Sequence, residues 1–175
     1  MRALRRTEVV QQPITFAAAA EAHLDDVYGY LVYLTGDRSL AEDLAAETFE
    51  KALRLWRRFD PARGAAKTWL CQIARTTALD HFRAERRRRG REDAYARREP
   101  QADEGPLVPG LSPDLERALL SLSAADRELV ALRVLLDLDG PTAARLLGIS
   151  ATACSTRLSR ALTRLEERMR DAVPA

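Results

Sequence analysis

Apolar residues recur every three or four positions through most of this chain, and short polar or glycine-containing breaks separate the resulting segments. This spacing is typical of amphipathic helices and predicts an all-α fold. A first helix is expected over residues 16–35, with Thr15 as its N-cap and Gly36 and Asp37 at its end. Its predicted inward positions are Phe16, Ala20, Leu24, Val27, Tyr28, Leu31 and Leu34.

A second helix is predicted from the capping-box pattern of Ser39 and Glu42 to about residue 58. Its apolar positions are Leu44, Thr48, Phe49, Ala52, Leu55 and Trp56. One exposed stripe, here called the acidic stripe, is expected to contain Asp43, Glu47 and Glu50, followed by Arg54. Such a stripe is most often a solvated surface. It can also orient a basic partner, and the pattern alone leaves both interpretations open.

A basic helix is predicted after a turn that contains Asp60-Pro61 and Arg63-Gly64. Its apolar positions are Leu70, Ile73, Ala74, Ala78 and Phe82, and its other face contains Lys67, Arg75, Thr76, Asp80, Arg83, Arg86 and Arg87. Trp69 lies near its start. Cations along a helix can follow a phosphate backbone, and an aromatic ring can stack on an unpaired base. Taken alone, the segment fits a solvated basic face equally well.

The helical periodicity fails over residues 90–111, which are rich in charged residues, glycine and proline. This composition predicts a flexible linker and a domain boundary. Residues 1–15 are interpreted as an N-terminal tail. The two helical domains are therefore expected over residues 16–89 and 112–173.

The second domain has the pattern of a helix-turn-helix protein. Leu115, Leu119 and Leu122 mark its first helix. Ser123, with Asp126 three residues on, caps a second helix that contains Leu129, Val130, Leu132, Val134 and Leu135. Gly140-Pro141 opens a short helix over residues 142–147. A turn at residues 148–150 leads to a long helix that ends near residue 170.

The long last helix has an apolar face formed by Cys154, Leu158, Ala161, Leu165 and Met169. Its outer residues are small, hydroxylated or basic: Thr152, Ser155, Thr156, Ser159, Arg160, Thr163 and Arg164. Arg157 and Arg160 place two cations on this helix, shortly after the turn at residues 148–150. This composition suits a major groove, because arginine bonds guanine and Ser or Thr reach bases or phosphates. A plain pair of packed helices is the alternative.

The overall composition excludes only a few classes of function. The 175 residues contain 28 Lys and Arg against 26 Asp and Glu, and a net charge of +2 does not by itself predict a nucleic-acid partner. Cys71 and Cys154 are far apart without metal-ligand spacing, so reduced thiols and no metal are expected. His23 and His81 have no nucleophile or phosphate loop beside them. We therefore expect no catalytic residues, no cofactor and no enzyme activity.

No long apolar run is present, which predicts a cytoplasmic protein without membrane insertion.

Two stretches together resemble one known family. AEDLAAETFEKALRLWRRFDPARGAAKTWLCQIARTTALDHFR resembles region 2 of the extracytoplasmic-function (ECF, group 4) sigma factors of bacterial RNA polymerase. LLSLSAADRELVALRVLLDLDGPTAARLLGISATACSTRLSRALTRLEE resembles their region 4. The resemblance implies that residues 16–89 bind the polymerase clamp and open the promoter −10 element. It implies that residues 112–173 read the −35 duplex and touch the flap, and that an anti-sigma factor is a further partner.

The resemblance also assigns candidate site residues. Those for core polymerase are Asp43, Glu47, Phe49, Glu50 and Arg54. Those for −10 DNA are Arg63, Lys67, Thr68, Trp69, Arg75, Thr76, Asp80, Arg83, Arg86 and Arg87. Those for −35 DNA are Thr152, Ser155, Thr156, Arg157, Ser159, Arg160 and Arg164. The chain departs from the family pattern at Ala46, Thr76, Thr142 and Ser155, where Gln, Asn, Glu and Lys are common.

Two other functions are compatible with parts of the pattern. A helix-turn-helix repressor or activator would bind duplex DNA without polymerase, but it would not need the acidic stripe or the basic helix with Trp69. A sigma mimic that titrates an anti-sigma factor would explain the altered recognition helix. Binding to core polymerase separates the first alternative from a sigma factor, and transcription by reconstituted holoenzyme separates the second.

Overall fold

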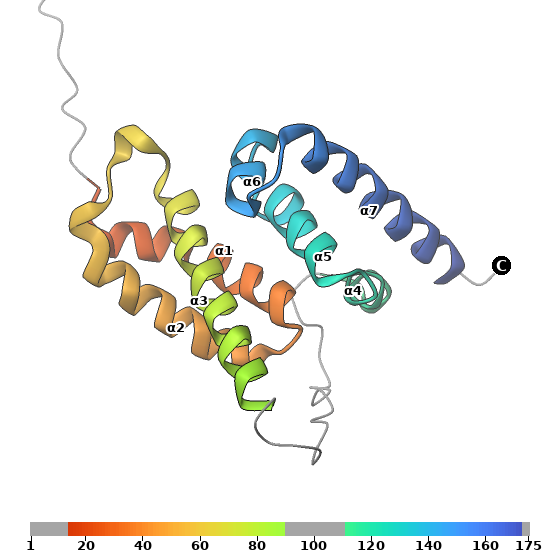
Figure 1. Ribbon diagram of the computed structural model, residues 1–175, viewed down its shortest axis with the longest axis horizontal. Coiled ribbons are helices and arrows are strands. Elements are labelled where there is room, and N and C mark those ends of the chain that lie inside the picture. Colours follow the sequence, from red (N-terminus) through yellow and green to blue (C-terminus); the bar gives the residue numbers. More distant parts are fainter. Residues whose placement is uncertain (1–13, 90–110, 173–175) are drawn as a thin grey trace, which may run out of the picture.

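The computed structural model describes residues 14–89 and 111–172, which form two helical domains (Figure 1). No strand occurs in those two ranges, so the all-α prediction is confirmed. Almost all of the predicted linker and tail lies outside the described residues.

The N-terminal domain is a three-helix bundle of α1 (Phe16–Thr35), α2 (Arg38–Leu55) and α3 (Ala66–Arg89). Two short 3₁₀ turns, η1 (Trp56–Arg58) and η2 (Pro61–Arg63), connect α2 to α3. The α1 bounds are those predicted: the Thr15 hydroxyl accepts a hydrogen bond from the Ala18 N–H, and Gly36 ends the helix at φ 67°.

The predicted N-cap of α2 was wrong, whereas the helical segment ends near residue 58 as predicted. Asp37, rather than Ser39, is the N-cap, and its carboxylate accepts a hydrogen bond from the Leu40 N–H at 3.0 Å. A capping side chain bonds two or three residues ahead, so the residue directly after Gly36 is in the right place. At the other end the α-helix stops at Leu55 and tightens into η1.

Large apolar side chains from all three helices meet in the bundle core, among them Leu31, Leu44 and Leu70, each at most 2% exposed. Full burial of such a side chain stabilises the fold by about 1.5–3 kcal/mol. Leu24 was predicted to join them but is 51% exposed. The later part of α1 is instead buried on more than one side, because it also faces the C-terminal domain.

The C-terminal domain contains α4 (Pro113–Leu120), α5 (Ala124–Val130), η3 (Ala131–Leu135), α6 (Gly140–Leu147) and α7 (Ala151–Ala172). As predicted, α6 and α7 form a helix-turn-helix, with Gly148 left-handed at φ 68° in the turn. The Ser123 and Ser150 hydroxyls cap α5 and α7 by accepting hydrogen bonds from the N–H groups of Asp126 and Ala153.

The segment η3 is a π-helical turn, which the apolar pattern does not predict. An extra residue in a helical turn rotates the side chains that follow it. Val134 and Leu135 are 57% and 37% exposed, whereas Leu136 and Leu138 are buried. The apolar pattern alone therefore does not say which residues of this segment join the core.

Candidate nucleic-acid and partner interfaces

The acidic stripe lies on the outer face of α2. Asp43, Glu47 and Glu50 are all exposed, as predicted. Glu47 pairs with Lys51 at 2.6 Å, and Glu50 pairs with Arg54 at 3.1 Å. Ion pairs this exposed contribute only about 0–1 kcal/mol, so the stripe is not needed for folding.

An apolar groove of about 340 Å³ lies between α1 and α2, beside the acidic stripe. Leu24, Tyr28 and Phe49 form its apolar surface together with Ala45 and Ala46, and the carboxylates of Asp25 and Glu42 also line it. Phe49 was predicted to contact the polymerase, whereas Leu24 and Tyr28 were predicted to face the core. Their i, i+4 spacing places them together, but it does not say whether they face the core or solvent.

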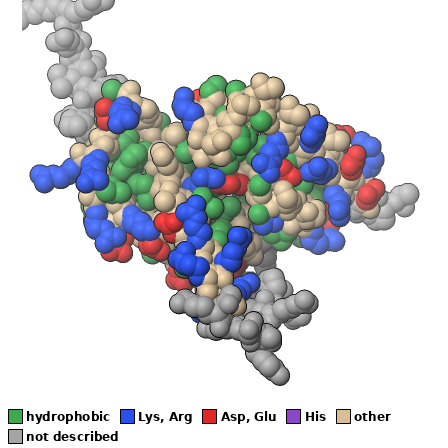
Figure 2. Space-filling model, in the orientation of Figure 1, with side chains coloured by type: hydrophobic (Ala, Val, Ile, Leu, Met, Phe, Trp, Pro, Cys, Tyr) green, Lys and Arg blue, Asp and Glu red, His purple; other side chains and the backbone are tan. Residues whose placement is uncertain are grey.

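The basic face of α3 is partly neutralised by carboxylates. Lys67 pairs with Asp26 at 3.2 Å, Arg83 pairs with Asp80 at 3.1 Å, and Arg75 pairs with Glu128 of the C-terminal domain at 2.8 Å. Other predicted DNA residues of this domain, namely Arg63, Thr76, Arg86 and Arg87, are exposed, and Thr68 is half-buried. Lys and Arg side chains gather near the end of α3 and over α7 in Figure 2. The expected cations are thus present, but Lys67, Arg75 and Arg83 already pair with carboxylates of the protein.

Trp69 lies in a cluster of four aromatic rings at one end of the bundle. Its ring centroid is 5.7 Å from that of Trp56 and 5.5 Å from that of Phe59, and Phe16 packs edge-on against Trp56. Trp69 is half-buried, so packing fixes its ring while leaving part of it accessible. Of these four rings, only Trp69 was predicted from the sequence to contact DNA. The other three rings come from different segments and were not expected to meet it.

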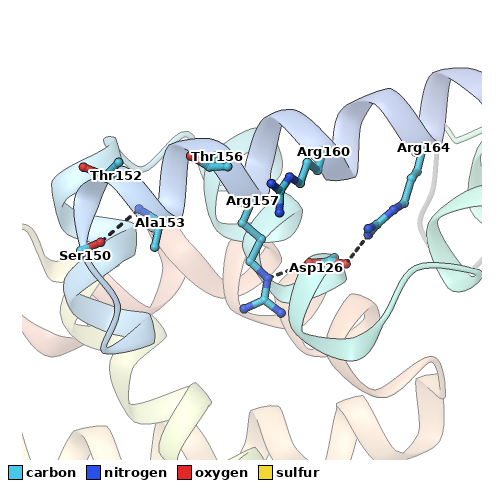
Figure 3. A pocket seen from close by; sticks show the side chains of 8 residues that line it. All are labelled: Asp126, Ser150, Thr152, Ala153, Thr156, Arg157, Arg160 and Arg164. Atoms are coloured by element: carbon cyan, nitrogen blue, oxygen red, sulfur yellow. Dashed lines mark hydrogen bonds and ion pairs between the residues drawn. The ribbon is translucent and has the colours of Figure 1, made fainter.

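The outer face of α7 presents the predicted hydroxyl and guanidinium groups. Thr152, Ser155, Thr156, Ser159 and Arg160 are exposed, and Cys154, Ala161 and Leu165 are buried as predicted. A cleft of about 620 Å³ runs along the helix and is lined by Ser150, Thr152, Ala153, Thr156, Arg157, Arg160, Arg164 and Asp126 (Figure 3).

Asp126 of α5 binds two of the arginines in this cleft. One carboxylate oxygen accepts a hydrogen bond from Arg157 Nε at 2.7 Å, and the other accepts one from Arg164 Nη1 at 2.9 Å (Figure 3). Arg160 lies between them in sequence and has no ion pair among the described residues. The three arginines therefore share a cleft but differ in their availability to a ligand.

Burial raises the pKa of Asp126, but hydrogen bonds from Arg157 and Ser123, together with the charges of Arg157 and Arg164, outweigh it. The pKa of the Asp126 carboxyl therefore lies below its ordinary value, and the group is ionised at neutral pH. Asp126 was not predicted from the sequence to be a partner of α7. Its spacing from Ser123 suggested only a helix cap.

Both cysteines are buried free thiols. Burial, followed by the charge of Asp26, raises the pKa of Cys71 to about 12, so this thiol is protonated and poorly nucleophilic. Within residues 14–89 and 111–172, no group of His, Cys, Asp and Glu is arranged to hold a metal ion. None of the helices in these ranges has the length and hydropathy required to span a bilayer.

Both domains match known protein families. Residues 19–88 match the sigma-70 region 2 family, and residues 113–165 match sigma-70 region 4. The ECF RNA polymerase sigma factor SigC of Mycobacterium tuberculosis is 34% identical over 146 residues, covering 82% of this chain and 77% of SigC. The chain belongs to the ECF sigma factors. The sigma factor CarQ of Myxococcus xanthus is 33% identical over 150 residues, covering 83% of each chain.

Another ECF sigma factor, BldN of Streptomyces coelicolor, is 32% identical over 160 residues. That match covers 89% of this chain but 61% of BldN. Among solved structures, the sigma factor RpoE of Bartonella quintana, in complex with the anti-sigma factor NepR, superposes with a TM-score of 0.68. It is 27% identical, and the match covers 89% of this chain and 96% of RpoE.

Proposed function

We propose that this ECF sigma factor binds core RNA polymerase and directs it to promoters through both of its domains. Region 2, over α1 to α3, would dock on the clamp and hold the opened −10 strand. Region 4, over α4 to α7, would read the −35 duplex and contact the flap. The observation that carries this proposal is the presence of both sigma regions, in order, in one chain.

The docking surface on polymerase is proposed to be the acidic stripe together with the apolar groove beside it. Apolar contact supplies affinity, whereas charges set orientation and association rate. Phe49 lines the groove, and Asp43 and Glu47 lie on the same helix. This arrangement suits a helical partner with an apolar ridge and basic flanks.

The −10 strand is proposed to lie along α3 and the aromatic cluster. Flipping a base costs a few kcal/mol, and stacking on an aromatic ring returns about 1–3 kcal/mol. Because Trp69 is held by Trp56 and Phe59, its ring needs little ordering when a base stacks on it. The near balance of the two energies means that polymerase contacts must help to keep the strands apart.

The test is run-off transcription with core polymerase and this protein on a genomic promoter library. Promoter-specific transcripts that depend on the protein would support the proposal. Binding to core polymerase without any transcript would instead favour a sigma mimic, and DNA binding without polymerase would favour a repressor. As part of the same proposal, we expect this sigma factor to bind an anti-sigma factor, to be located in the cytoplasm and to have no enzymatic activity.

Arg160→Ala is expected to weaken −35 binding by about 1–3 kcal/mol and to relax sequence preference at one base pair. The reason is that Arg160 is exposed on α7, whereas the Asp126 carboxylate pairs with Arg157 and Arg164 instead. The measurement is binding to a set of −35 duplexes that differ by single substitutions. Arg168→Ala, on an exposed position further along α7, is the matched control. A uniform loss on every duplex would show that Arg160 contacts only phosphate.

A further inference from the structure

The two domains of this protein pack against each other through a defined face. The later half of α1 contacts α5 and η3, and α5 runs close to α1 in Figure 1. Tyr30 is fully buried there, and Val32 and Tyr33 are at most 5% exposed. A helix that is buried nearly all round needs partners on more than one side. The bundle covers one side of α1, and the C-terminal domain covers another.

A carboxylate from α5 lies at the centre of this contact. Glu128 Oε1 accepts a hydrogen bond from the Tyr30 hydroxyl at 2.9 Å and a second from Arg75 Nε at 2.8 Å. Glu128 is only 7% exposed. A buried carboxylate is costly unless it is paired. Both hydrogen bonds come from the N-terminal domain, so the pairing of Glu128 depends on the contact between domains.

The same contact alters the state of Arg75, one of the proposed −10 DNA residues. Its Nε is bound to Glu128, and its side chain is 25% exposed. A DNA phosphate would bind the same guanidinium by the same type of charge-assisted hydrogen bond. A phosphate that binds through Arg75 Nε would have to displace Glu128 from that nitrogen.

We propose that the face of the N-terminal domain around Tyr30 and Arg75 is an interaction surface for the chain's own α5, held by Glu128. In the closed chain Glu128 occupies the site on Arg75 where DNA would bind, so single-stranded DNA binds only after the domains separate. The competition with DNA rests on the proposed role of Arg75, whereas the contact itself does not.

The experiment uses the full chain with Glu128→Ala, Glu128→Gln and the matched control Glu167→Ala. Glu167 is exposed on α7, and its removal changes the net charge by the same amount as Glu128→Ala. Small-angle X-ray scattering reports the radius of gyration. Fluorescence anisotropy with a labelled random-sequence single strand of about 20 nucleotides reports DNA affinity.

Glu128→Ala is expected to increase the radius of gyration and to tighten DNA binding about tenfold relative to Glu167→Ala, because a hydrogen bond to a charged group is lost. Glu128→Gln should lie between the two, since its amide oxygen still accepts hydrogen bonds but is uncharged. Tyr30→Phe removes one of the hydrogen bonds without changing the charge and should shift both readouts in the same direction. Thermal melts check that each variant is folded.

An unchanged radius of gyration in folded Glu128→Ala and Tyr30→Phe would overturn the interaction surface. Expansion without tighter DNA binding than in Glu167→Ala would overturn the competition. Adding Arg75→Ala to Glu128→Ala should remove the gain in DNA affinity. If the gain persists, Arg75 is not the DNA contact, and the proposed −10 assignment fails at that residue while the contact between domains stands.

Discussion

Reversing Asp43 and Glu47 to lysine is expected to reduce affinity for core RNA polymerase by several kcal/mol while leaving the fold intact. Both residues are exposed, and Glu47 makes only a surface ion pair, so the free energy of unfolding should change by less than about 1 kcal/mol. Like charges brought close at an interface cost several kcal/mol. Affinity for core polymerase, measured together with a thermal melt, checks this result.

The matched control is reversal of Glu167 and Asp171 to lysine. These two residues have the same i, i+4 spacing and are also exposed, but they lie on α7, away from the proposed docking face. The control changes net charge equally and should retain affinity for core polymerase. Wild-type affinity in the Asp43 and Glu47 reversal would remove the acidic stripe from the interface and reopen the repressor interpretation.

Local features of the fold could be predicted because they depend on neighbouring residues. A hydroxyl at Thr15 and a glycine at position 36 are enough to bound α1, and the spacing of Cys154, Ala161 and Leu165 is enough to orient α7. The Ser39 capping box failed because Asp37, two residues earlier, is an equally good cap. Sequence patterns identify candidates for a cap, but geometry selects among them.

The remaining features depend on contacts between distant residues. Glu128 is 98 positions from Tyr30 and 53 from Arg75, and Asp126 is 31 from Arg157. On α5 alone both acids are typical of a solvated helix surface. The exposure of Val134 and Leu135 has another cause, because one π turn rotates the side chains of this segment.

The structure separates charged residues that look equivalent in the sequence, because some of them are paired within the protein. The sequence predicts basic surfaces on α3 and α7, and both helices present exposed arginines, among them Arg86 on α3 and Arg160 on α7. Two acids on α5 bind arginines from both surfaces: Asp126 binds Arg157 and Arg164, and Glu128 binds Arg75. Candidate DNA residues that look equivalent in the sequence therefore fall into two groups, those already paired with carboxylates and those, such as Arg160, that face the cleft without an ion pair among the described residues.

Asp126→Ala is expected to destabilise the C-terminal domain by about 2–4 kcal/mol. Removing one member of a buried ion pair typically costs about 3–5 kcal/mol. The Arg157 and Arg164 side chains are 38% and 57% exposed, so water screens them and the cost is lower. Asp114→Ala is the control, because Asp114 pairs with Arg117 on the exposed surface of the same domain and should change stability by less than about 1 kcal/mol. Urea unfolding followed by circular dichroism measures both.

The effect of Asp126 should also depend on pH in one direction. The pKa of its carboxyl in the folded protein is below its ordinary value, so the folded state favours the ionised form. The stabilisation is complete above the unfolded pKa of about 3.9 and is lost as the pH falls through the folded pKa. The stability difference between wild type and Asp126→Ala should therefore stay constant from neutral pH to about pH 5 and shrink below about pH 4. A difference that stayed the same at about pH 3 would show that Asp126 stabilises the domain by packing rather than by its charge.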